Sequence, residues 1–103
     1  RWNFLLYAIN QLINHLDKVN VMSSNGFKAK AIIRTGIGSQ RPLHPQHQHI
    51  GDFTESIRKM CTTIDVIKLN EPEDIFPSYK KALIREDGKS TVLVEYGDYY
   101  NEK

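Results

Sequence analysis

A chain of 103 residues is long enough for one domain, and its formal net charge of +2 is too small to predict nucleic-acid binding. Its composition, 40% hydrophobic and 25% charged, is typical of a globular protein, and no apolar run approaches the roughly 18 residues that a membrane span needs. The only cysteine, Cys61, allows no internal disulfide, which predicts a reducing compartment and a cytoplasmic location.

The chain begins with a helical pattern. Leu5, Ile9, Leu12 and Leu16 recur at helical spacing and predict a helix from Asn3 to Lys18. Because the pattern starts almost at the first residue, which is not Met, we expect the chain to be a piece of something longer. Leu6 and Ile13 make the apolar stripe wider than one sheet face can cover, which predicts a homo-oligomer.

A predicted strand from Phe27 to Thr35 follows a turn at residues 23–26. Its apolar residues point to both faces, which is typical of a strand in a parallel sheet covered on both sides. The strand leads into a long polar loop, Gly36 to Gly51. A loop of this length after a buried strand lies where α/β sheets place their ligand sites, outside the carboxyl ends of the strands.

Three of the four histidines, His44, His47 and His49, stand in this loop. They could bind a metal ion, but no cysteine or carboxylate stands in the loop at the spacing of a metal site. They could also be solvated loop residues. We favour a third interpretation, a histidine that contacts a substrate as a hydrogen-bond donor or proton carrier near neutral pH.

The rest of the chain alternates helices and strands. The spacing of apolar residues predicts a helix from Asp52 to Met60 and a strand from Ile64 to Leu69. Asn70 and Glu73 resemble a capping box for a helix that runs towards Arg85, in which Pro77 should kink or delay the regular part. A third strand is predicted from Thr91 to Tyr96.

Strands joined by helices predict an α/β fold: one domain, residues 1–103, with a three-layer arrangement of a parallel sheet and helices on its faces.

Several motifs, taken in order, resemble a known family. They are the helix from Phe4 to Lys18, the segment Ala31-Ile32-Ile33-Arg34-Thr35-Gly36-Ile37-Gly38, the loop Pro42-Leu43-His44-Pro45-Gln46-His47 and the segment Lys81-Ala82-Leu83-Ile84-Arg85. Their order resembles the thiamine diphosphate-dependent enzymes. The chain is most similar to the pyrimidine-binding domain of 2-oxo-acid dehydrogenase beta subunits, and more distantly to the central domain of transketolase.

The resemblance implies a partial site. It covers the C-terminal half of the pyrimidine-binding domain, and nothing in the chain corresponds to the glutamate that activates the cofactor or to the Gly-Asp-Gly magnesium motif. The implied cofactor is thiamine diphosphate with magnesium, and the implied partners are the diphosphate-binding domain or subunit and a second copy. The chain alone should be inactive, whereas the parent enzyme would cleave or form a carbon–carbon bond next to a carbonyl.

The resemblance also implies site residues. His47 aligns with the histidine of a Gln-His-Ser-Gln turn and would be catalytic. Trp2 and Phe4 would bind the cofactor, whereas from the residues alone they are interpreted as core or interface aromatics. Backbone oxygens of three residues would hold potassium: Leu83, Ile84 and Glu86. An ordinary helix end with free carbonyls is the alternative at those three positions. The alternative for the whole chain is a non-catalytic assembly module whose histidine loop is an interaction surface.

Overall fold

The computed structural model describes residues 1–40 and 43–98, and its centre is a sheet of three parallel strands. The strand order is β1 (Ile32–Ile37), β3 (Thr91–Tyr96) and β2 (Asp65–Lys68). Thr91 lies opposite Ile32 of β1 and opposite Asp65 of β2. The predicted α/β class with a parallel sheet is therefore confirmed.

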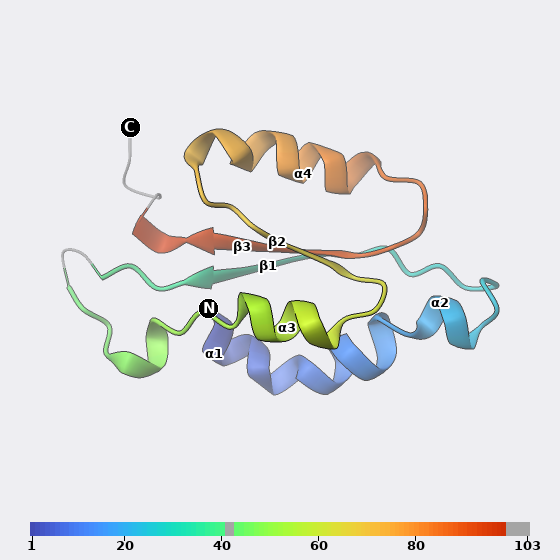
Figure 1. The fold of residues 1–103 in the computed structure, drawn as a ribbon, viewed down its shortest axis with the longest axis horizontal. Coiled ribbons are helices and arrows are strands. Elements are labelled where there is room, and N and C mark those ends of the chain that lie inside the picture. The colour runs from blue at the N-terminus through green and yellow to red at the C-terminus, as the bar shows by residue number, and fades with distance from the viewer. Residues whose placement is uncertain (41–42, 99–103) are drawn as a thin grey trace.

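Helices pack on both sides of this sheet. Figure 1 shows α4 (Ile75–Ile84) on one side, and α1 (Trp2–Leu5) with α3 (Thr54–Met60) on the other. Two apolar clusters fill the spaces between. The buried members of the larger one are Trp2, Leu12, Ile37, Ile57, Ile64, Val66, Val92 and Val94. Those of the smaller one, under α4, are Leu69, Ala82 and Leu93. The central strand is fully buried at residues 92–94 because both of its faces are covered.

The first helical segment is present but irregular. After α1 it continues as a 3-10 turn, η1 (Leu6–Ala8), then as a π-helical segment, η2 (Gln11–Leu16), and ends in α2 (Val19–Met22). The N–H of Asp17 donates to the carbonyl oxygen of Leu12 over 2.9 Å, a step of five residues. Periodicity predicted a helix here, but it could not predict the change to five-residue hydrogen-bond steps that places Asp17 in the core.

β1 begins later than predicted. Residues 27–31 lie outside the ladder, and the strand continues instead through Ile37. The Ser90 side chain takes the place of ladder bonds there: its hydroxyl accepts from the N–H of Ala31 and donates to the carbonyl of Ala29, both over 2.9 Å. A serine 59 positions from Ala31 therefore sets where the strand starts.

The start of α4 corrects the expected cap and agrees with the expected delay, because the regular part of the helix that contains Pro77 begins only at Ile75. A 3-10 turn, η4 (Pro72–Asp74), precedes it, and its N-cap is Glu71 and not Asn70, so the cap does not stand at the expected position. Pro77 is the third residue of α4 and does not interrupt it. The first four N–H groups of a helix have no partner within it, so a proline costs no hydrogen bond at that position. In the described part of the chain, no helix is long and apolar enough to cross a membrane.

Candidate functional site

The histidine loop is attached directly to the end of β1. The N–H of Gly38 donates to the carbonyl oxygen of His49 over 3.2 Å. A Cβ at Gly38 would lie 2.3 Å from that oxygen, so only glycine allows the approach. The Gly-Ile-Gly sequence therefore allows the backbone at the end of β1 to contact the backbone of the histidine loop.

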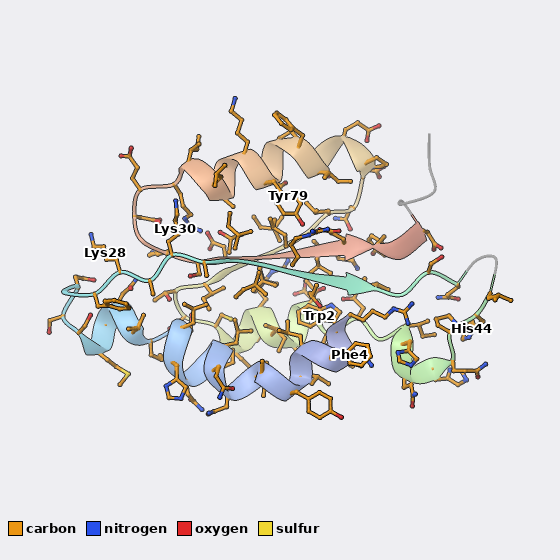
Figure 2. The ribbon with its side chains drawn as sticks, turned by 180° about the vertical axis from the view of Figure 1, so that it is seen from behind. Trp2, Phe4, Lys28, Lys30, His44 and Tyr79 are labelled. Atoms are coloured by element: carbon orange, nitrogen blue, oxygen red, sulfur yellow. The ribbon has the colours of Figure 1, made fainter. Side chains whose placement is uncertain are left out.

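The loop ends in a 3-10 turn, η3 (His47–His49), which brings its histidines to different places. The ring of His49 lies against the first helix: its Nδ1 is 3.3 Å from the Asn3 amide nitrogen, and its centroid is 5.9 Å from that of Phe4. His47 is exposed and pairs edge-to-face with His44, with ring centroids 5.8 Å apart. Figure 2 shows His44 at the outer end of the loop, away from Trp2. The three histidines thus do not converge on one point.

The residue before the turn has an unusual backbone conformation. Gln46 has φ 77° and ψ 165°, a region that is almost restricted to glycine. Its N–H donates to Nδ1 of His44 over 3.1 Å, which helps to hold it there. Such strain costs about 1–3 kcal/mol and is concentrated at functional sites. The strain stands immediately before His47, the predicted catalytic residue.

Trp2 and Phe4 occupy different environments. Trp2 is 1% exposed and packs edge-to-face on Phe53 at 6.2 Å between ring centroids, whereas Phe4 is 58% exposed. Figure 2 shows Trp2 directed between the helix and the sheet, with Phe4 on the helix next to it. Trp2 is therefore a core residue whose indole can act only through its N–H, and Phe4 offers an open aromatic face.

Buried polar atoms without partners gather near this end of the sheet. The Nε1–H of Trp2, the Oδ1 of Asn3 and the Oγ1 of Thr35 are buried and make no hydrogen bond with the residues that the structure describes. Buried polar groups are nearly always hydrogen-bonded, so each needs an explanation. Trp2 and Asn3 are neighbours in α1, and they present one unused donor and one unused acceptor.

An ion pair between Asp52 and Lys68 joins the start of α3 to the sheet. Lys68 at the end of β2 donates to Asp52 over 2.6 Å and lies 5.3 Å from the ring centroid of Tyr96. Burial opposes the charge of Asp52, but the bonds from Lys68 and Thr54 outweigh it and keep the pKa of Asp52 below its ordinary value. Asp52 accepts from the N–H and the hydroxyl of Thr54 at the start of α3. It is thus a structural link and not a free catalytic acid.

A second charged group lies on the opposite face of the sheet. Glu95 accepts from Arg34 over 2.8 Å and also from the hydroxyl of Tyr79, which Figure 2 shows directed from α4 towards the sheet. Burial and the Glu95 carboxylate raise the pKa of Tyr79 to about 12. The sequence analysis did not single out Arg34 and Glu95. A charged residue in each of two apolar strands nevertheless indicates an ion pair between the strands.

Asp17 is a further acid that sequence reasoning missed. It is fully buried, and its carboxylate accepts from the backbone N–H groups of Thr62, Thr63 and Ile64 at 2.7–2.8 Å. Lys18 adds an ion pair at 2.6 Å. Burial alone would raise the pKa of Asp17, but these hydrogen bonds outweigh it and hold the pKa far below the ordinary value.

Cys61 lies beside this carboxylate. Burial first, and then the charge of Asp17, raise the pKa of the Cys61 thiol to about 11. The thiol therefore stays protonated at neutral pH, so it is not an activated nucleophile.

The predicted potassium positions are at the end of α4, far along the sheet from the histidine turn. The Lys30 ammonium donates to the carbonyl oxygens of Leu83 and Arg85, at 2.7 and 3.1 Å, and Figure 2 shows Lys30 near that end of the helix. A cation of the chain itself thus contacts one of the three residues. Potassium at Leu83, Ile84 and Glu86 stays a prediction.

No group of three His, Cys, Asp or Glu side chains is placed to hold a metal ion in residues 1–40 and 43–98. No protein-family model, curated protein or solved structure matches the chain. The function is therefore argued from the geometry of the histidine turn and its surroundings.

Proposed function

We propose that the chain forms part of a cytoplasmic thiamine diphosphate-dependent enzyme that acts on 2-oxo acids or ketoses. In this proposal it contributes part of the site for the cofactor's pyrimidine ring and a subunit interface. One observation carries it: an unused buried donor and an unused buried acceptor, on Trp2 and Asn3, stand beside a strained histidine turn at the end of a parallel strand.

The unused atoms are of the two kinds, a donor and an acceptor, with which an aminopyrimidine ring would pair. Such a ring carries nitrogen acceptors next to an amino donor, so it can take the N–H of Trp2 and give a hydrogen bond to Oδ1 of Asn3. Phe4 adds an exposed aromatic face on the same helix. The fit concerns the pyrimidine end only, and the diphosphate and its magnesium would be held by the partner domain or subunit.

When bound, the cofactor supplies an electron sink for breaking a carbon–carbon bond next to a carbonyl. The residues of the chain would orient the reacting groups and donate hydrogen bonds to them. Asn3 fixes His49, and Gly38 holds the backbone of the turn against β1. His47, exposed at the start of that turn, would donate a hydrogen bond to a substrate oxygen or exchange a proton with it.

Trp2 provides the test, because it is the only tryptophan of the chain and its indole N–H gives one NMR signal. We expect thiamine diphosphate with magnesium to shift this signal downfield, as the N–H gains an acceptor. Half-saturation should need millimolar cofactor, since the chain holds only the pyrimidine end. Magnesium pyrophosphate, which lacks the pyrimidine, is the control and should leave the signal in place.

Two results would contradict the proposal. An indole signal that does not move at millimolar cofactor would show that Trp2 does not form part of a pyrimidine site. Micromolar binding would show that the chain holds a complete site and is not a part of one.

The alternative, a non-catalytic module, is favoured by one observation: His44 and His47 are both exposed and their rings pack edge-to-face on each other. In that case the histidine turn is a docking surface, and no cofactor shifts the Trp2 signal. The same titration therefore separates the two candidate functions.

A further inference from the structure

The hydrogen bond between Gln46 and His44 assigns the protonation state of the His44 ring. The N–H of Gln46 donates to Nδ1 of His44 over 3.1 Å. A neutral imidazole has one nitrogen that donates and one that accepts, so the hydrogen of the neutral His44 ring stands on Nε2. An imidazolium has no acceptor, because both of its nitrogens carry hydrogen. The bond can therefore exist only while His44 is neutral.

The same bond supports the strained backbone of Gln46, whose φ is 77°. The N–H of this residue is bonded to His44, and its carbonyl oxygen accepts from the N–H of His49 over 3.1 Å in η3. Gln46 is therefore held on both of its backbone polar groups. When the bond to His44 is lost, one of the two interactions that oppose the strain disappears, and relief of the strain then favours an ordinary negative φ.

The ring of His47 is the titratable neighbour of His44. The two ring centroids are 5.8 Å apart, and both side chains are exposed. Within residues 1–40 and 43–98, no carboxylate, lysine or arginine forms an ion pair or a hydrogen bond with either ring. Two imidazolium rings at this distance repel each other. Protonation of the pair therefore removes the bond to Gln46 and also drives the two rings apart.

The end of the loop is attached independently of His44. The N–H of Gly38 donates to the carbonyl oxygen of His49, and the Asn3 amide contacts the ring of His49. Neither contact uses a group of His44 or Gln46. A change at His44 would therefore begin at Gln46 and leave His49 attached to the end of β1 and to the first helix.

We propose that His44 and His47 form a pH-dependent conformational switch in the histidine loop. At neutral pH the neutral ring of His44 holds Gln46 in its strained conformation. Histidine side chains gain their proton between about pH 8 and pH 5. As pH falls through this range, the bond opens, Gln46 leaves the positive φ and the His47 ring separates from His44. This inference does not depend on the proposed cofactor site, and it makes any contact of His47 with a ligand dependent on pH.

An NMR titration of the whole chain from about pH 8 to about pH 5 tests the switch. At the start we expect the ring nitrogen shifts of His44 to show a hydrogen on Nε2 and none on Nδ1. On acidification the Gln46 amide proton should move upfield in step with the His44 ring signals. Its protection against hydrogen exchange, corrected for the intrinsic pH dependence of exchange, should fall by roughly fivefold, which is the factor that one ordinary hydrogen bond contributes.

The variant His44→Asn separates the acceptor from the titration. The Oδ1 of an asparagine accepts a hydrogen bond from the N–H two residues further along, and it does not gain a proton in this range. The Gln46 amide signal should therefore stay in place throughout the titration. His47→Asn is the matched control, which keeps the His44 ring and should keep the response. Both side chains are exposed, so the fold should persist, and thermal melting checks this.

Three results would overturn the proposal. The first is a His44 ring that gains its proton while the Gln46 amide signal and its protection stay unchanged. The second is a response of Gln46 that persists in His44→Asn. The third is a neutral His44 ring whose hydrogen stands on Nδ1, because that ring could not accept from the N–H of Gln46.

Discussion

Lys30 donates a hydrogen bond of 2.7 Å from its ammonium to the carbonyl oxygen of Leu83, 53 positions along the chain. Carbonyls in the last turn of a helix have no donor within it, and positive charge is favourable there. A second bond to Arg85 extends the contact beyond the helix end. The lysine therefore provides a fixed cation where the resemblance implies a free one.

The first prediction concerns this cation. Melting curves of the natural chain in potassium and in tetramethylammonium, at matched ionic strength, should coincide because the ammonium already holds the carbonyl of Leu83. Lys30→Met should lower the free energy of unfolding by about 0.5 kcal/mol, and Lys80→Met on the surface of α4 is the control. A natural chain that potassium stabilises would show an ion at Leu83, Ile84 and Glu86 beside the lysine.

The second prediction concerns acid. Hydrogen bonds hold the folded-state pKa of Asp17 below its unfolded value, so the unfolded chain takes up the proton first as pH falls. The contribution of Asp17 to stability is complete above pH of about 4–5 and is lost below it, as pH falls through the folded pKa. Urea unfolding between neutral pH and acid measures this loss.

Variants of Asp17 separate the charge from the packing. Asp17→Ala removes the acceptor of the N–H groups of Thr62, Thr63 and Ile64, the last of them buried, and should cost about 3 kcal/mol or more at neutral pH. Asp17→Asn should cost less and should flatten the acid dependence. Asp65→Asn, at an exposed partner of Arg85, is the control and should change little. An unchanged acid dependence in Asp17→Asn would contradict the assignment.

The third prediction concerns the strained residue of the histidine loop. Gln46→Gly should raise the free energy of unfolding by about 1 kcal/mol, because relief of about 1–3 kcal/mol of strain exceeds the entropic cost of glycine. Gln48→Gly, at a position without positive φ, should instead lower it. Chemical denaturation measures both, and equal effects of the two glycines would show that Gln46 is not strained.

The fourth prediction concerns His47 and needs the complete enzyme, since the chain alone should have no catalytic activity. His47→Ala should lower turnover by roughly 10²-fold, as expected for a positioned acid–base group, without changing the melting temperature. His44→Ala is the matched control, because it removes the neighbouring ring in the same loop. Unchanged turnover in His47→Ala, with damage from His44→Ala or His49→Ala, would assign the role to another histidine.

The structure bears out predictions that depend on local pattern. Thr91–Tyr96 was predicted with its observed bounds, because the apolar residues 92–94, which lie in a short segment between two turns, have few alternatives. The start of β1 could not be predicted, since it depends on the side chain of Ser90, which approaches only after folding. The same holds for the contact between Gly38 and His49, which the Gly-Ile-Gly sequence permits but does not specify.

The missed site residues share one cause, which is that their partners are distant in sequence. Asp17 bonds residues 45–47 positions away, and Glu95 bonds Arg34 61 positions away. A signal was present for Asp17. A negative charge near the C-terminal end of a helical segment is unfavourable unless a donor group compensates it, so an acid there implies a specific partner.

The π-helical segment from Gln11 to Leu16 has a consequence for changes in chain length. A wider turn holds one residue more than an α-helical turn, so deletion of one residue between 11 and 16 would restore α-helical winding. Five α-helical residues, each turning by about 100°, would then replace six more widely wound ones, so the total rotation would change little and Asp17 would still face the N–H groups of residues 62–64. This stretch should therefore tolerate the loss of one residue better than a regular helix of the same length would.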